Sequence, residues 1–180
     1  MPFYFKKTPI ENLLIIEFQK FGDHRGFFIE RYKRSDFLTN GITEDFVQDN
    51  HSFSNKGVLR GIHFQTAPME QGKLVQVISG AAWDVAVDLR QDSPTFGKWF
   101  GTVLSGKNCL GIYIPAGFGH GFVTLEDSTH FLYKCTNCYS PDHERGIRWD
   151  DPILNVKWPL SDVVISEKDK KLPYFEEITV

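Results

Sequence analysis

Short apolar segments recur along the chain, and each is bounded by Gly, Pro, Asn, Asp or Ser. Segments of this length separated by turn-forming residues are typical of strands, and many in one chain predict a sandwich or barrel. The expected strands are Leu13–Phe18, Phe27–Tyr32, Lys73–Ser79, Ala82–Leu89, Gly111–Ile114, Gly121–Leu125 and His130–Cys135. Helices are expected only at Ser35–Asn40, between a Ser35 cap and Gly41, and at Ser166–Lys171 with Ser166 as cap. The sequence therefore predicts an all-β fold with a few short helices.

One segment shows the strand period clearly. Apolar residues at positions 83, 85, 87 and 89 alternate with Asp84, Ala86, Asp88 and Arg90. A period of two places the apolar set on one face of a strand and both carboxylates on the other.

Length and charge limit the classes of protein. The 180 residues suffice for one substantial core, so we expect a single domain over residues 1–180. A formal net charge of −3 argues against a nucleic-acid partner, because such proteins usually carry a basic stripe. No segment approaches the roughly 20 apolar residues that cross a bilayer, so no membrane span is expected.

Three cysteines, Cys109, Cys135 and Cys138, make an odd number, and the N-terminal residues lack the apolar run of a signal peptide. Both features favour a cytoplasmic location. Cys135 and Cys138 form a CxxC, which without a second ligand pair is at most half a zinc site. We expect free thiols there.

Two glycine-punctuated runs contain most of the groups suited to chemistry. The first covers residues 57–65 (GVLRGIHFQ) and is followed by Lys73; the second covers residues 115–122 (PAGFGHGF). His63 and Gln65 share one strand face, so Arg60, His63 and Lys73 can converge on a cavity. The Pro and Gly of the second run predict a turn that delivers His120 at a strand start.

These runs resemble the two cupin motifs, which implies a cupin-type jelly-roll β-barrel. The matching residues are Gly57, His63, Gln65 and Glu70 in the first motif and Pro115, Gly117 and His120 in the second. Metal-binding cupins have a histidine at the position of Gln65. The nearby Lys73 would also repel a divalent ion. We therefore expect no metal and no cofactor.

A narrower resemblance covers about residues 10–173. The matching stretches are DHRGFFIE (23–30), QDNHSFS (48–54), GVLRGIHFQ (57–65), GKLV (72–75), DVAVDLR (84–90), SPT (93–95), PAGFGHGF (115–122), YK (133–134), YSP (139–141), ERGI (144–147), WDDP (149–152) and SEKD (166–169). Their order and spacing resemble the dTDP-4-dehydrorhamnose 3,5-epimerase family. The resemblance implies epimerisation at C3 and C5 of dTDP-4-dehydro-6-deoxy-D-glucose, in dTDP-L-rhamnose biosynthesis.

Such a reaction requires a base, a group that stabilises the developing enolate, and an acid on the opposite face of the ring. The resemblance places His63 as the base and Asp169 as its partner. It implies Lys73 at the oxyanion and Tyr133 as the acid. Imidazole titrates near neutral pH, and a fixed cation favours the enolate over the neutral ketone, so the residue types fit these roles.

The resemblance also implies a nucleotide-sugar site and a homodimer in which an N-terminal segment crosses to the partner. Residues expected around the dTDP-sugar are Arg25, Glu30, Gln48, Asn50, Arg60, His120, Glu144 and Lys168. Arginines form forked contacts to phosphate oxygens. Arg25 and Glu30 would then serve the neighbouring subunit, although Arg25 also suits a local ion pair with Asp23.

Three alternatives remain open on the sequence alone. One is an epimerase that inverts only C3 or only C5 of a related dTDP-4-keto sugar. Another is a metal-binding cupin enzyme, and the third is a non-catalytic cupin that binds a sugar nucleotide.

Overall fold

The computed structural model describes residues 2–178 and is dominated by strands. The strands are β1 (Phe3–Lys7), β2 (Leu14–Phe18), β3 (Lys20–Asp23), β4 (Gly26–Ile29), β5 (Gln48–Ser54), β6 (Val58–Gln65), β7 (Lys73–Ser79), β8 (Ala81–Asp88), β9 (Trp99–Ser105), β10 (Leu110–Ile114), β11 (Phe118–Thr124), β12 (Thr129–Cys135), β13 (Glu144–Gly146) and β14 (Val164–Ile165). One α-helix, α1 (Arg34–Thr39), and two 3₁₀ turns, η1 (Asp169–Lys171) and η2 (Phe175–Glu177), complete the described elements. The predicted all-β class is confirmed.

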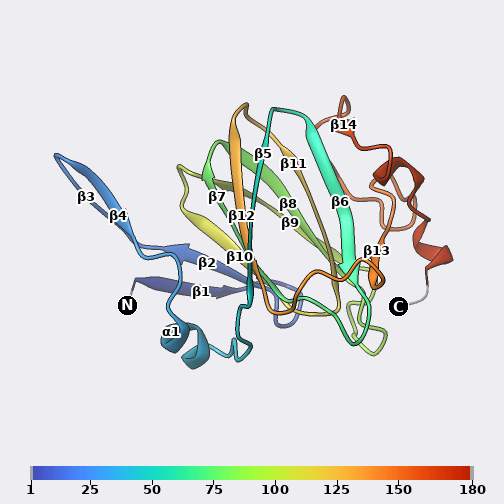
Figure 1. Cartoon of the computed structure of the whole chain (residues 1–180), viewed down its shortest axis with the longest axis horizontal. Coiled ribbons are helices and arrows are strands. Elements are labelled where there is room, and N and C mark those ends of the chain that lie inside the picture. Colours follow the sequence, from blue (N-terminus) through green and yellow to red (C-terminus); the bar gives the residue numbers. More distant parts are fainter. Residues whose placement is uncertain (1, 179–180) are drawn as a thin grey trace.

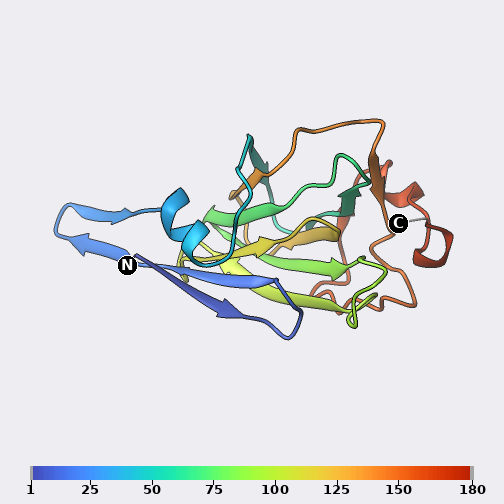
Figure 2. The same cartoon turned by 90° about the horizontal axis from the view of Figure 1, so that it is seen from below.

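Two sheets face one another to form the barrel (Figure 1). The first sheet has the strand order β1-β2-β10-β7-β12-β5, and the second has the order β13-β6-β11-β8-β9 with β14 beside β6. Neighbouring strands are antiparallel throughout, except that β14 runs parallel to β6. The view from below shows the two layers, with the β3–β4 hairpin projecting away from them (Figure 2). This is the jelly-roll arrangement expected from the cupin resemblance.

The main core lies between the sheets. The first sheet contributes Val75, Val77, Ile112, Ile114 and Phe131, and the second contributes Ala82, Ala86, Leu104, Phe118 and Phe122. Phe122 and Phe131 stack across the gap with ring centroids 3.8 Å apart. Burying each large side chain contributes about 1.5–3 kcal/mol, so this contact helps to hold the sheets together around the cavity.

The outer faces of both sheets are partly covered. Helix α1 buries Phe37 against Phe3 and Phe18 on the first sheet. The chain after β13 covers the second sheet, where Ile147, Leu154 and Val156 pack on residues of β6 and β8. The C-terminal tail is therefore fixed on the barrel, in a position to supply residues to a site.

Strand β8 has the predicted alternation, but both of its faces are buried. Val85 and Val87 lie under the tail, whereas Asp84 and Asp88 on the other face have no exposed surface. The Asp88 carboxylate accepts hydrogen bonds from the Arg90 guanidinium and from the hydroxyls of Ser93 and Thr95. The face that carries the carboxylates is therefore enclosed rather than solvated.

Removing the charge of Asp88 is expected to destabilise the protein. Burial alone would raise the pKa of Asp88, but hydrogen bonds from Arg90, Ser93 and Thr95 outweigh burial and lower it to about 2. A carboxyl whose folded pKa is depressed contributes stability above its unfolded pKa and loses it as the pH falls through the folded pKa. Asp88→Asn should therefore cost on the order of 2 kcal/mol at pH 7, and less from pH 4 down to pH 2.

Denaturant titrations at pH 7 and pH 3 would measure this difference. Asp92→Asn, a change at an exposed carboxylate two residues from Arg90, is the control. Equal stability of the Asp88→Asn variant and the natural protein at pH 7 would contradict the structural role of Asp88.

Both predicted helices exist, with differences at their starts. Helix α1 begins at Arg34 and its N-cap is Lys33, so Ser35 is not the cap. The Ser35 hydroxyl instead donates to Asp36. Gly41, with φ of +88°, ends the helix as predicted. The second helix is shortened to η1, but the Ser166 hydroxyl does accept a hydrogen bond from the backbone N–H of Asp169 at 3.0 Å.

None of the helices in residues 2–178 is long and apolar enough to cross a membrane.

Candidate active site

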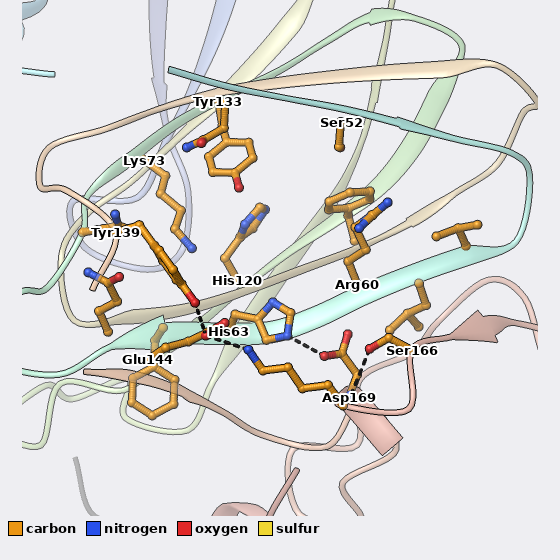
Figure 3. A pocket seen from close by; sticks show the side chains of 18 of the residues that line it. Ser52, Arg60, His63, Lys73, His120, Tyr133, Tyr139, Glu144, Ser166 and Asp169 are labelled. Carbon is orange, nitrogen blue, oxygen red and sulfur yellow. Dashed lines mark hydrogen bonds and ion pairs between the residues drawn. The ribbon is translucent and has the colours of Figure 1, made fainter. Parts of the chain in front are cut away.

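A cavity of about 690 Å³ lies between the sheets, lined by β5, β6, β7, β11, β12 and the C-terminal tail (Figure 3). Every residue predicted for the site lines it, with the exceptions of Arg25 and Glu30. The set is Gln48, Asn50, Arg60, His63, Lys73, His120, Tyr133, Glu144, Lys168 and Asp169. Segments more than 100 residues apart in the sequence thus meet at one place, as the two motif runs suggested.

A β-bulge in β6 allows Arg60 and His63 to reach the same cavity. The β6–β11 register shifts between the pairs Phe122–Arg60 and His120–His63. Without the shift, residues three apart on a strand face opposite sides. Gly61 has φ of +116° at this point, and a Cβ there would lie 2.6 Å from the Cα of Gly121. Only glycine fits a position with that dihedral and that backbone contact.

His63 is held by a buried carboxylate from the tail. Its Nε2 lies 2.8 Å from Oδ1 of Asp169, whose Oδ2 also accepts the backbone N–H of Gly61. Burial alone would raise the pKa of Asp169, but hydrogen bonds from His63 and Gly61 outweigh it and lower the pKa. An ionised Asp169 accepts the Nε2 proton, which leaves Nδ1 of the neutral imidazole as the basic atom. The side chain of His63 is 31% exposed and lines the cavity.

Lys73 and Tyr133 come from the first sheet, opposite His63 (Figure 3). Lys73 is buried, and burial lowers its pKa. Burial also raises the pKa of Tyr133, so this phenol is protonated at neutral pH. An ammonium in such a site favours any reaction step that creates negative charge beside it.

His120 lies deep in the cavity, beside His63 in the β6–β11 register. Its Nε2 is 2.8 Å from Oδ2 of Asp84, a carboxylate with no exposed surface. Burial lowers the pKa of His120 and outweighs the opposing influence of Asp84. Asp84 was not predicted as a site residue, although its period-two pattern had placed it opposite the apolar face of its strand.

At the cavity mouth, three side chains form a chain of short hydrogen bonds. The Tyr139 hydroxyl donates to Oε2 of Glu144 at 2.6 Å, and the Lys168 ammonium donates to the same oxygen at 2.6 Å. Burial alone would raise the pKa of Glu144, but Lys168 and Tyr139 lower it. Tyr139 was missed as a site residue, although it belongs to one of the matching stretches.

The polar wall of the cavity comprises Gln48, Asn50 and Arg60. The Gln48 amide donates to Asn50, and the Arg60 guanidinium donates to the Ser54 hydroxyl at 3.3 Å. Arg60 makes no ion pair among the described residues, so it retains its capacity for an anion.

Two residues predicted for the site lie elsewhere. Arg25 and Glu30 do not line the cavity of their own chain, because the β3–β4 hairpin leaves the barrel (Figure 1). Arg25 is exposed and pairs with Asp23. Within one chain, Arg25 and Glu30 do not join the other site residues, and their expected role at a neighbouring subunit's site stays a prediction.

The donor set does not resemble a metal centre. Residues 2–178 contain no group of three or more His, Cys, Asp or Glu side chains that could hold a metal ion. Gln65, at the position of a cupin metal ligand, bonds instead to the backbone of Met69, Cys138 and Ser140. The three cysteines are free thiols, as expected.

Comparison with known proteins gives one consistent result. A sequence model of the dTDP-4-dehydrorhamnose 3,5-epimerase family matches residues 7–177. The enzyme of that name from Shigella flexneri is 51% identical over 164 residues, covering 91% of each chain. The enzyme of that name from Methanothermobacter thermautotrophicus is 48% identical over 171 residues, covering 93% of this chain and 92% of its own.

Solved structures agree with the sequence comparison. The dTDP-6-deoxy-D-glucose-3,5-epimerase of Legionella pneumophila, in complex with dTDP-4-keto-L-rhamnose, superposes with a TM-score of 0.95. It is 46% identical, covering 98% of this chain and 95% of its own. A 3'-monoepimerase from Streptomyces bikiniensis, in complex with dTDP-quinovose, has a TM-score of 0.87 and 32% identity over 93% of this chain and 85% of its own.

Proposed function

The chain belongs to the dTDP-4-dehydrorhamnose 3,5-epimerase family, and from this premise we propose how its cavity performs the reaction. It is an isomerase that inverts C3 and C5 of dTDP-4-dehydro-6-deoxy-D-glucose to give dTDP-4-dehydro-L-rhamnose, in dTDP-L-rhamnose biosynthesis. The arrangement that best supports our mechanism is the placement of His63 and Tyr133 on opposite sheets. A sugar ring between them has a base on one face and an acid on the other.

We propose that His63 removes the proton from each carbon beside the ketone. The hydrogen bond from Nε2 to Asp169 fixes the tautomer and stabilises the imidazolium that forms. Lys73 donates to the ketone oxygen, where negative charge develops as the enolate forms. Because burial makes an ammonium costly, a developing anion beside Lys73 is especially favourable.

The phenol of Tyr133 then returns a proton to C5 from the opposite face, which inverts that centre. Its raised pKa keeps it protonated and ready to donate. The conjugate phenolate forms near Arg60, whose positive charge acts to lower the pKa of Tyr133. Inversion at C5 thus results from removal and return of a proton on different faces of the ring.

We propose that the polar wall and the mouth bind the nucleotide. Arg60 suits the diphosphate, since its guanidinium can donate two parallel hydrogen bonds to phosphate oxygens. Gln48 and Asn50 offer amide groups to the base or ribose. Glu144 and Lys168 already pair with each other, so they meet the ligand as a linked pair.

The experiment that tests this function is proton NMR in deuterated water with dTDP-4-dehydro-6-deoxy-D-glucose. Deuterium should enter at both C3 and C5, and EDTA should leave the rate unchanged because every proposed group is a side chain. Exchange at one carbon only would support the single-centre alternative. Activity that returns only on addition of iron or zinc would exclude the metal-free mechanism.

We also propose that the protein acts as a homodimer whose β3–β4 hairpin completes the neighbouring site. The hairpin projects from the barrel and exposes Phe27 and Phe28, which are 60% and 67% exposed. Exposed large rings mark an interaction surface. Arg25 and Glu30 lie on or next to this hairpin, away from their own cavity, so insertion into a partner would place them near its nucleotide.

Mixing two inactive variants is expected to restore activity if the hairpin crosses. Arg25→Ala lacks a residue of the hairpin, whereas His63→Ala lacks the proposed general base, which lies on the barrel. A mixed dimer contains one complete site, so an equal mixture that exchanges subunits should recover about a quarter of normal activity by symmetry. Each variant alone is the control, and a mixture no more active than their average would exclude the crossing.

The three unpaired cysteines support a reducing compartment, and we propose the cytoplasm as its location.

A further inference from the structure

Two carboxylates on the same face of β8 have very different surroundings. Asp84 and Asp88 both have no exposed surface. Asp88 accepts hydrogen bonds from the side chains of Arg90, Ser93 and Thr95. These bonds explain how a carboxylate can be buried at this position. The carboxylate of Asp84 has one hydrogen-bond partner among residues 2–178, the imidazole of His120.

The second oxygen of Asp84, Oδ1, is buried and has no hydrogen-bond partner in the described part of the chain. A buried carboxylate that is incompletely paired costs free energy, and an apolar side chain of similar size is often at least as stable. Stability alone therefore does not account for Asp84. Its one contact leads to His120, which lines the cavity.

The contact determines which nitrogen of His120 carries a proton. An ionised carboxylate only accepts hydrogen bonds, so the Nε2 atom, 2.8 Å from Oδ2, must be the donor. Burial lowers the pKa of His120, Asp84 opposes this, and the neighbouring Lys73 and His63 lower it further. A neutral imidazole with its proton on Nε2 has an unprotonated Nδ1, and no protein group in residues 2–178 bonds to that atom.

We propose that Asp84 is a positioning residue that holds His120 as the neutral, Nε2-protonated tautomer, so that Nδ1 accepts a hydrogen bond from a sugar hydroxyl. The inference rests on the proposed function and gives the site one hydrogen-bond donor and one hydrogen-bond acceptor for the sugar. Lys73 donates to the ketone oxygen, whereas His120 accepts from a hydroxyl. Lys73 and His120 together recognise a sugar that carries both a ketone and a hydroxyl. A nucleoside diphosphate without the sugar contacts neither side chain.

The tautomer can be measured in the unmodified protein. Nitrogen-15 NMR of the histidine-labelled protein at neutral pH, with the signals of His120 assigned by their loss in His120→Gln, distinguishes the ring nitrogens. We expect a neutral ring with its proton on Nε2 and a free Nδ1. A proton on Nδ1, or on both nitrogens, would overturn the proposal, and this measurement does not depend on the folding of an Asp84 variant.

The consequence for binding is tested by calorimetry with dTDP and with dTDP-D-glucose, which carries hydroxyls and does not react. Asp84→Asn keeps the side-chain volume and removes the charge. It should weaken dTDP-D-glucose binding about three- to tenfold, as expected for one lost hydrogen bond, and leave dTDP binding unchanged. The NMR signals of His120 should also shift in Asp84→Asn. A purely structural role of Asp84 does not require such a shift.

Asp88→Asn is the matched control, because it removes a buried carboxylate from the same strand face without touching His120. It should lower stability and leave the ratio of the two affinities unchanged. Normal dTDP-D-glucose binding in Asp84→Asn would contradict the role of Asp84 alone. Failure of the natural protein to bind dTDP would instead contradict the proposed function.

Discussion

Replacing His63 with alanine is expected to lower the rate of epimerisation by about 10²–10⁴-fold and to remove deuterium exchange at both C3 and C5. Both carbons flank the same ketone, and His63 is the base proposed for each. Its partly exposed side chain and its hydrogen bond to Asp169 are the structural grounds. The measurement is proton NMR in deuterated water, which follows each carbon separately.

His130→Ala is the control for this variant, because His130 lies on β12 outside the cavity and bonds to His51. It should retain normal exchange. Asp169→Asn should reduce the rate less than His63→Ala, since the base remains but its tautomer is no longer fixed. Normal exchange at either carbon in His63→Ala would mean that another group removes that proton.

Replacing Tyr133 with phenylalanine is expected to separate proton removal from inversion. The base still acts, so deuterium continues to enter C5, whereas net inversion at C5 falls by about 10²–10⁴-fold through loss of the acid. Removing one hydroxyl from a half-buried ring leaves its packing beside Phe131 in place. Coupling to a rhamnose-forming reductase measures inversion, and NMR measures exchange.

Tyr4→Phe on strand β1 removes an exposed hydroxyl far from the cavity and serves as the control. It should change neither quantity. Full inversion in Tyr133→Phe would assign the acid to another residue. A non-catalytic sugar-nucleotide binder would show exchange above the uncatalysed rate in none of these proteins, so the series also tests that alternative.

The sequence predicted several of the strands whose apolar residues alternate or form continuous runs, but it missed β1 and β9, which are also rich in apolar residues. Lys73–Ser79 was predicted with its observed bounds, and Ala82–Leu89 within one residue of β8. Strand β5 was missed because its seven residues, QDNHSFS, are mostly polar. It is a strand because it pairs with β12 at the edge of the first sheet, an interaction between distant segments that local propensity does not reveal.

The composition of the site was more predictable than its geometry. The family resemblance led to His63 and Asp169, which the fold brings to 2.8 Å although they are 106 positions apart in the sequence. The bulge that turns Arg60 and His63 to one side was not predictable from local pattern, since it arises where β6 meets β11. Asp84 followed the strand period, but nothing near it in the sequence indicated that it contacts a residue of the site.

The position of Asp169 along the chain has a consequence for biosynthesis. The polypeptide is made from its N-terminus, and Asp169 follows every strand, including both walls of the cavity. A nascent barrel therefore possesses His63, Lys73 and Tyr133 before the carboxylate that orients the imidazole has been synthesised. On the proposed mechanism, catalytic competence is therefore acquired late, when the tail docks on the finished barrel.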